Sequence, residues 1–163
     1  MPTPPFVLAL REKIGHDLLW MPGVSAVVFR AAEHSPTGRE QVLLVKRADN
    51  GQWTPTTGII DPGEEPAVAG AREVLEETEV EAVAESLVWV HTLPPMRYPN
   101  GDASQYLDLT FRFRWVAGEP GPGDGENSAA AWYHLDELPA MSAEMVARIE
   151  HARTPELGCR FTG

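Results

Sequence analysis

The sequence predicts a mixed α/β fold, and three observations support this interpretation. Short runs rich in β-branched and aromatic residues recur along the chain, and they lie at residues 24–30, 41–46, 87–93, 105–115 and 130–134. Two further stretches, 67–78 and 142–151, are typical of helices. No internal repeat and no linker interrupts residues 1–163. Strands combined with helices in one uninterrupted chain indicate a single domain built on a mixed sheet.

Composition narrows the class of protein. The chain has 163 residues, 43% of them hydrophobic, which is enough to bury a core. Its formal net charge of −11 argues against non-specific nucleic-acid binding, although a metal ion could still bridge it to a small polyphosphate. Cys159 is the only cysteine, so an intramolecular disulfide is not possible. The sequence lacks a recognisable signal peptide or membrane span, and we expect a cytoplasmic protein with no membrane partner.

The first third of the chain contains a helix, a hairpin and a loop. Apolar residues at positions 6, 7, 10, 14 and 18 predict a peripheral helix within residues 1–20, over Phe6–Leu19. Val24–Arg30 and Gln41–Lys46 read as two strands of a hairpin, separated by the turn-rich AEHSPTGRE. Thr54–Gly63 is rich in Thr, Pro and Gly, and we expect a loop there.

The remaining elements alternate between helix and strand. Pro66 suits the first turn of a helix that continues over residues 67–78. Residues 87–93 and 105–115 are strands that flank the loop PPMRYPNGD, and apolar residues alternate with polar ones in the second strand. That alternation predicts one buried and one exposed face. A flexible loop, GEPGPGDGEN, then leads to the strand 130–134, and a helix over 142–151 closes the chain.

The helix 67–78 gathers its carboxylates on one side. At a rotation of about 100° per residue around the helix axis, the side chains of Glu73, Glu76 and Glu77 project from the same side of the helix. The opposite side, which we expect to pack on the sheet, holds Val68, Ala71, Val74, Leu75 and Thr78. Three like charges within one turn destabilise a helix unless a cation lies among them. Oxygen ligands without His or Cys favour Mg²⁺ or Mn²⁺ over zinc.

A solvated acidic surface is the alternative for any single glutamate here, since Glu is mostly exposed. The spacing of the whole set is more specific. From residue 58 to 80 the chain has Gly, five residues, Glu, seven residues, Arg-Glu, a hydrophobic residue, any residue, Glu-Glu, any residue, then Glu79 and the hydrophobic Val80. This stretch resembles the Nudix box, and eight of nine specified positions match. Segments outside the box, LLVKR and AAAWYHLDELP, are also similar to the family.

The resemblance implies a Nudix-type α/β/α sandwich and a MutT-like pyrophosphohydrolase that cleaves a nucleoside diphosphate linked to another group. It implies that Glu73, Glu76, Glu77 and the backbone carbonyl of Thr57 hold Mg²⁺ or Mn²⁺. Arg72 and Glu64 would orient these ligands. Relatives take the general base either from the box or from a later loop, so Glu73 and Glu126 are both candidates, and Glu126 is also a candidate metal ligand.

The substrate is less clearly encoded. Pro95 lies fifteen residues beyond Val80, as in ADP-ribose types, and Tyr98 lies eighteen beyond it, as in dinucleoside polyphosphate types. Nucleoside triphosphates, ADP-ribose and dinucleoside polyphosphates therefore all stay open. Tyr98 could stack on a base, while Arg47 and Arg97 could contact phosphate.

Two further hypotheses concern the protein as a whole. A catalytically silent Nudix-like module that binds a regulatory nucleotide is the alternative to an enzyme, although silent relatives usually lose box carboxylates. A homodimer is common in the family, and the N-terminal helix could serve one.

Glu79 stands where the family has glycine at the helix stop. Glycine takes the left-handed conformation there without steric cost. The sequence leaves two alternatives open: Glu79 adopts that conformation at a cost of about 1 kcal/mol, or the helix continues for another turn.

Overall fold

The computed structural model describes residues 3–123 and 125–162, so the predicted domain limits at residues 1 and 163 lie outside the described residues. In chain order its helices and strands are α1 Pro5–Ile14, β1 Leu19–Arg30, β2 Gln41–Arg47, β3 Trp53–Thr54, β4 Thr56–Ile59, α2 Pro66–Thr78, β5 Glu81–Thr92, β6 Met96–Arg97, β7 Ala103–Ala117, β8 Asn127–His134, α3 Ala143–Arg153 and β9 Arg160–Phe161. Two short 3₁₀ turns, Ala32–His34 and Pro155–Leu157, complete the list. The predicted combination of strands and helices is confirmed.

The strands form one mixed sheet in the order β3-β2-β1-β7-β5-β9, with β8 paired to β2, β6 to β7 and β4 to β1. Its centre is the long parallel pair of β1 and β7, in which Ser25 lies beside Thr110. The pairs β1–β2, β2–β8 and β5–β7 are antiparallel. The predicted mixed sheet, including the hairpin of β1 and β2, is therefore confirmed.

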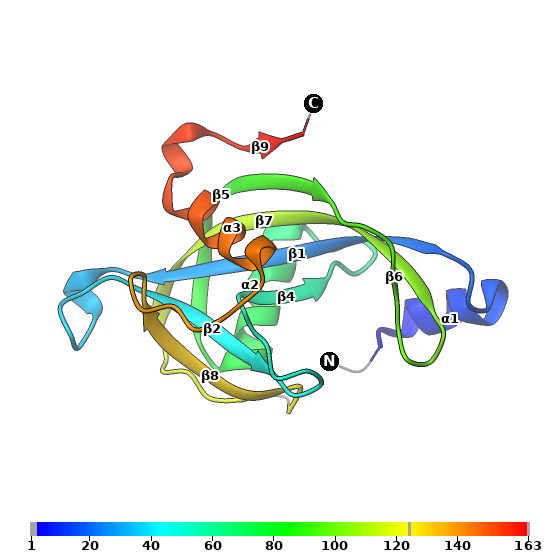
Figure 1. Cartoon of the computed structure of the whole chain (residues 1–163), viewed down its shortest axis with the longest axis horizontal. Helices are drawn as coiled ribbons and strands as arrows, with labels where there is room; N and C mark the ends of the chain where they lie inside the picture. The colour runs from blue at the N-terminus through cyan, green and yellow to red at the C-terminus, as the bar shows by residue number, and fades with distance from the viewer. Residues whose placement is uncertain (1–2, 124, 163) are drawn as a thin grey trace.

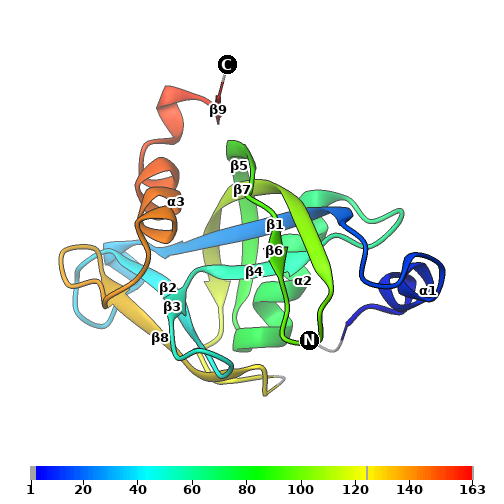
Figure 2. The ribbon, with the colours of Figure 1, turned by 45° about the vertical axis from the view of Figure 1, so that its right-hand side comes forward.

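Helices α2 and α3 cover opposite faces of this sheet (Figure 1). Successive β1 residues point to alternate faces, so Ala26 and Val28 pack with Val74 of α2, while Val27 and Phe29 pack with Ile149 of α3. The result is the α/β/α sandwich that the resemblance to the Nudix family implies. Turning the molecule by 45° keeps α1 at one end of the sheet, away from α3 (Figure 2).

The N-terminal helix is shorter than predicted. It ends at Ile14, and Gly15 follows it with a positive φ of 58°. Residues 19 and 20 already belong to β1, so the expectation of one helix through Leu19 is wrong. Within α1 only Val7 is buried, because the helix packs on the molecule through one short edge. Arg11 ties that edge to β7 by donating to the carbonyl of Ala103 and to Ser104 Oγ, at 2.7 and 3.0 Å.

The prediction of an uninterrupted loop over Thr54–Gly63 is also wrong. β4 pairs antiparallel with β1, with Thr57 beside Ser25 and Gly58 beside Val24. Its β-branched residues suit this pairing, and the edge of β1 is available there because β2 pairs only with its last two residues. β9 adds a short parallel strand beside β5 that the sequence reading did not anticipate.

β7 differs from the predicted pattern of one buried and one exposed face. Its polar residues Asp108 and Thr110 are buried, with exposed fractions of 4% and 0%. They lie on the face that α3 covers, so both faces of the strand are enclosed at this point. A strand pattern reports only its own alternation and does not show whether a helix packs on its polar side.

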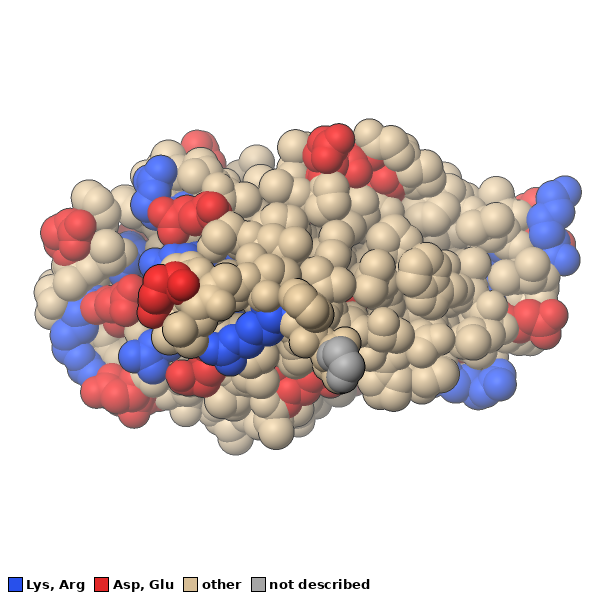
Figure 3. All heavy atoms as spheres, turned by 90° about the horizontal axis from the view of Figure 1, so that it is seen from above, with Lys and Arg blue, Asp and Glu red and all other residues tan. Residues whose placement is uncertain are grey.

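The surface is mixed in charge. Seen from above, acidic and basic side chains lie together at the two ends of the molecule, and mostly uncharged surface lies between them (Figure 3). No helix in the described ranges is long and apolar enough to cross a membrane.

Candidate active site

The loop between β4 and α2 is closed by a turn that places Glu64 opposite Arg72. The amide of Glu64 donates to the carbonyl of Asp61, and the amide of Asp61 donates back to Glu64 Oε2 at 3.2 Å. Pro66 then begins α2, where its missing N–H has no cost. This local geometry brings Glu64 within reach of a residue on the second turn of the helix.

Arg72 lies at the centre of the box carboxylates. Its Nε and Nη2 donate to the two oxygens of Glu64 at 2.8 and 2.9 Å, and its Nη1 donates to Glu73 at 3.0 Å and to Glu76 at 3.3 Å. The hydrogen bond from Arg72 lowers the pKa of Glu64. The guanidinium therefore fixes more than one carboxylate, as its planar fork allows.

Glu73 is the most enclosed of the box carboxylates. It is 1% exposed, and it lies so close to β4 that a Cβ on Gly58 would come within 2.1 Å of Glu73 Cδ. Its Oε2 is buried without a hydrogen-bonding partner in the described part of the chain. Burial raises the pKa of Glu73 to about 7; Arg72 opposes this rise, and the carboxylates of Glu77 and Glu76 add to it. The carboxylate of Glu73, packed against residue 58, therefore explains why that residue is glycine.

The predicted faces of α2 need correction. Val68 and Leu75, which were expected to pack on the sheet, are 58% and 50% exposed. Glu73 and Glu77 are buried, whereas Glu76 is 46% exposed. The projection at 100° per residue misplaces these residues because β4 and the β7–β8 loop flank the helix and cover part of its acidic side. Val68 and Leu75 are therefore left at the surface.

The loop between β7 and β8 docks on the end of α2. The amides of Gly121 and Gly123 donate to the carbonyls of Thr78 and Glu77 at 3.0 and 3.1 Å. These bonds satisfy carbonyls that a helix end leaves without partners. The same approach brings Asn127 Nδ2 to 3.1 Å from Glu77 Oε2, where it donates a hydrogen bond.

Glu79 ends the helix in the left-handed conformation, with φ 62° and ψ 12°. It is the only non-glycine residue with positive φ in the described ranges. The first of the two sequence alternatives is confirmed, and the alternative of a further helical turn is wrong. The backbone of Glu79 is enclosed, since a Cβ on Gly118 would lie 2.6 Å from its carbonyl oxygen.

A cavity of about 620 Å³ opens beside the box, and its size suits a nucleotide. Five predicted or motif residues line it: Thr57, Gly58, Glu73, Glu77 and Glu126. Arg47 and Tyr98 line it as well; Arg47 is paired with Asp49 at 2.7 Å, and the hydroxyl of Tyr98 lies 2.9 Å from that of Tyr106. Arg97 is not among the lining residues, and its Nη1 donates to the carbonyl of Gly101.

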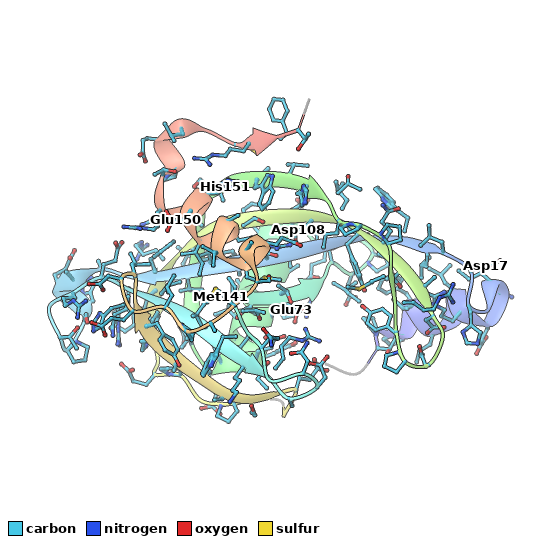
Figure 4. The ribbon with its side chains drawn as sticks, viewed as in Figure 1. Asp17, Glu73, Asp108, Met141, Glu150 and His151 are labelled. Atoms are coloured by element: carbon cyan, nitrogen blue, oxygen red, sulfur yellow. The ribbon has the colours of Figure 1, made fainter. Side chains whose placement is uncertain are left out.

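The cavity wall also contains residues that the sequence reading did not select. Asp108 and Arg148 line it, and with Ser25 and Thr110 they form a buried polar cluster next to Thr57, because Ser25 pairs with Thr57 across β1 and β4. Asp108 and Glu73 both lie in the centre of the molecule, and Asp108 lies nearer α3 (Figure 4). A lone Asp in a strand was the only available signal, and its partner comes from a helix forty residues later.

The carboxylates of the Nudix box suit a hard cation by their chemistry. In the described ranges no three His, Cys, Asp or Glu side chains already converge as a metal-binding group, because Arg72 holds Glu76 and one oxygen of Glu73. However, Glu73 keeps a buried oxygen without a partner beside the carboxylate of Glu77. Oxygen donors of this kind fit Mg²⁺ or Mn²⁺.

Fold and site together define a Nudix-type protein, and comparison with known proteins agrees. The family model described as NUDIX domain matches residues 20–153, so the chain belongs to this family. It is 42% identical over 101 residues to a protein of Bacillus subtilis named provisionally as an 8-oxo-dGTP diphosphatase, covering 61% of this chain and 62% of that one.

Two further comparisons extend this result. A MutT-like protein of Streptomyces ambofaciens is 29% identical over 107 residues, which cover 66% of this chain and 64% of the relative. The chain thus spans just under two thirds of the length of these two relatives. The crystal structure of a MutT NUDIX hydrolase from Burkholderia pseudomallei is similar in fold, with a TM-score of 0.63 at 22% identity over 82% of this chain and 98% of that one.

Proposed function

We propose that the protein hydrolyses a pyrophosphate bond in a nucleoside diphosphate linked to another group, with Mg²⁺ or Mn²⁺ as cofactor. The observation that carries this proposal is the buried, unpartnered Oε2 of Glu73 at the end of a nucleotide-sized cavity. A carboxylate in that setting is costly unless a cation completes it. The family to which the chain belongs supports the same chemistry.

Glu73, Glu77 and the carbonyl of Thr57 would hold the metal, because all three residues line the same cavity and the carboxylates of Glu73 and Glu77 interact. The bound metal supplies charge neutralisation on the phosphates and a lower pKa for the attacking water. Glu76 would join them once its bond to Arg72, 3.3 Å long here, is exchanged for the cation. Arg72 and Glu64 orient the carboxylates from outside the cavity.

We assign the general base to Glu126 in preference to Glu73. Glu126 lies on the docked β7–β8 loop and lines the same space as Thr57 and Glu77. Glu73 is committed to Arg72 and, in this proposal, to the metal. A base must reach the water that attacks the phosphate, and a residue on the open side of the site meets this requirement better than an enclosed one.

The proposed substrate is a nucleotide. Three classes stay open: a nucleoside triphosphate, ADP-ribose and a dinucleoside polyphosphate. The name of the Bacillus subtilis relative favours the first of these. Tyr98 lines the cavity and could stack on a base, and Arg47 at its rim could meet a phosphate, whereas Arg97 would have to leave its bond to Gly101 to do so.

The test is release of a nucleoside monophosphate from these substrates, measured with and without Mg²⁺ or Mn²⁺. Glu77→Gln keeps the size of the side chain and removes its charge, and we expect turnover to fall at least about 100-fold. Glu81→Gln, an exposed glutamate on β5, is the matched control and should leave turnover unchanged. A wild-type protein that binds these nucleotides but turns none over would instead support a silent binding module.

A further inference from the structure

The β7–β8 loop lies against the last turn of α2 at backbone distance. The amides of Gly121 and Gly123 donate to the carbonyls of Thr78 and Glu77, and we call this pair of bonds the loop–helix contact. A Cβ on Gly123 would lie 2.1 Å from the carbonyl oxygen of Glu76, which belongs to the helix backbone and cannot turn aside. The loop therefore comes this close to α2 only because residue 123 has no side chain.

The two glycines of this contact differ in their surroundings. The nearest atom to a Cβ on Gly121 would be Glu79 Oε2, at 3.1 Å, at the far end of an exposed and flexible side chain. Neither Gly121 nor Gly123 has a positive φ, so the backbone at both positions accepts alanine. Space alone separates them, and only Gly123 sets how closely the loop approaches α2.

Other elements hold the loop on both sides of this contact. Before it, Trp115 Nε1 donates to the carbonyl of Gly118 at 2.9 Å. After it, the amide of Ala48 donates to the carbonyl of Glu126 at 3.0 Å. The short segment that carries Glu126 is therefore held between Gly123 on one side and Ala48 on the other, so a displacement at residue 123 is passed on to Glu126.

Glu126 and Glu77 line one small space. A hollow of about 60 Å³ lies between them, and Thr57 and Arg47 also line it. A polar space of this size has room for a water molecule. Gly123 bonds the backbone carbonyl of Glu77 itself, so the loop–helix contact refers the position of Glu126 directly to the residue that faces it.

We infer that Gly123 is a positioning residue, whose close contact with the carbonyls of α2 sets where Glu126 lies relative to Glu77. This inference rests on the proposed function, because it concerns the general base of the same reaction. Gly123 itself lies outside the lining of the cavity and of the small hollow. It therefore acts on the reaction only through Glu126.

A double-mutant cycle in the full chain tests this inference. Its readout is Mg²⁺-dependent turnover of dGTP, ADP-ribose or diadenosine tetraphosphate, whichever the wild-type protein cleaves fastest. Glu126→Gln should lower kcat about 100-fold, which is a typical contribution of a general base. Gly123→Ala should lower kcat at least about tenfold and leave KM within about twofold, because a displaced base slows the reaction and not binding. In the Glu126→Gln background, Gly123→Ala should cost no more than about twofold, because no base remains to be displaced.

Gly121→Ala is the matched control, since it adds the same methyl group to the same loop–helix contact where only a flexible side chain is near. It should change kcat by less than about twofold. Mn²⁺ affinity, measured by calorimetry, is a readout that does not depend on turnover. It should stay within about threefold in Gly123→Ala, because Asn127, which donates to Glu77, is held separately by the pairing of β8 with β2.

An equal loss of kcat from Gly123→Ala in both backgrounds would overturn the inference, because the glycine would then act on the fold as a whole. A loss of Mn²⁺ affinity as large as the loss of kcat would overturn it too, since the contact would then position Glu77. Should Gly123→Ala fail to fold, Trp115→Phe removes the donor to the carbonyl of Gly118 and must itself show a loss of kcat that disappears in the Glu126→Gln background.

The proposed function fails in a different way. If the wild-type protein cleaves none of the three nucleotides, hydrolysis is rejected and the inference with it. If the wild-type protein is active and Glu126→Gln leaves turnover unchanged, the inference alone is rejected.

Discussion

Two groups of polar residues at the cavity wall are built in different ways. In the Nudix box, the carboxylates that Arg72 holds come from the loop before α2 and from α2 itself, and Glu73 keeps an oxygen without a partner in the described part of the chain. In the second group, residues 25, 108 and 148 come from three separate elements, and Asp108 has a protein donor on each oxygen. The first group leaves one buried oxygen for a cation to contact, while the carboxylate of the second group is paired within the protein. A metal ion therefore suits the first group and not the second.

The largest expected effect concerns the packing of Glu73 on β4. In Gly58→Ala the new methyl group would lie 2.1 Å from Glu73 Cδ, so the carboxylate must move. We expect turnover to fall at least about 100-fold, because a shift of about 1 Å at a reacting centre has that effect. Unfolding in urea should show a loss of about 1–3 kcal/mol.

Gly121→Ala is the control for this change, since its methyl group would meet only the flexible carboxylate of Glu79, at 3.1 Å. Equal losses in both variants would show that Gly58 is required by the backbone and not by Glu73.

The pH dependence of stability should reveal the buried carboxylate of Glu73 directly. Burial raises the pKa of Glu73 to about 7, so between pH 4.5 and 7 the folded, metal-free protein keeps a proton that the unfolded chain has lost. The free energy of unfolding therefore contains a contribution that falls as pH rises through this window, by on the order of 3 kcal/mol. Urea titrations with a chelator present measure it, and Glu73→Gln should remove it.

Magnesium should weaken the same dependence, because a cation bound at Glu73 competes with the proton. If the slope in the metal-free protein persists in Glu73→Gln, another group is responsible.

A smaller effect is expected from the link between the β7–β8 loop and Glu77. Asn127 donates to Glu77 Oε2 at 3.1 Å, and Asn127→Ala removes this donor. Partners that orient a metal ligand typically contribute about 10-fold or more to metal affinity, so binding of Mn²⁺ by calorimetry should weaken by about that factor. Ser128→Ala, next along the chain, donates only to the carbonyl of Lys46 and should have no effect on Mn²⁺ binding. An unchanged affinity in Asn127→Ala would show that the loop positions Glu126 alone.

The contrast between the Nudix box and the cluster of Asp108 and Arg148 also explains what the sequence could reveal. The box is readable because Glu64, Arg72 and Glu76 meet over spacings of eight and four residues, which the turn and the helix fix locally. Asp108 and Arg148 meet only because β1 and β7 run in parallel and α3 crosses their polar face. No pattern within either segment carries that information.

Two errors in the sequence reading have the same origin. Val68 and Leu75 were placed on the buried face because a helical wheel gives only the angle of each residue around the axis, and it does not include the segments that flank the helix. The strand β4 was read as loop because Pro55 and Gly58 interrupt its pattern, although the free edge of β1 makes the pairing favourable. The longer strands, the helices α2 and α3, their order and the mixed sheet were predictable, whereas the short strands and the surroundings of each element were not.

The smallest expected effect belongs to Glu79, whose left-handed backbone is strained but whose side chain lies outside the cavity wall. Glu79→Gly should raise the free energy of unfolding by about 1 kcal/mol, because glycine adopts this conformation without a Cβ clash. Glu79→Ala keeps the backbone cost and removes the charge, so the difference between the two variants in urea isolates the conformational term.

Turnover and Mn²⁺ affinity should change little in Glu79→Gly. The bonds from Gly121 and Gly123 to the carbonyls of Thr78 and Glu77 already fix the end of α2, whichever residue follows it. A large loss of Mn²⁺ affinity would instead mean that the side chain of Glu79 itself contributes to metal binding. The family's glycine position is thus a matter of how the helix ends, and in this chain the docked loop holds that end in place against the backbone strain of Glu79.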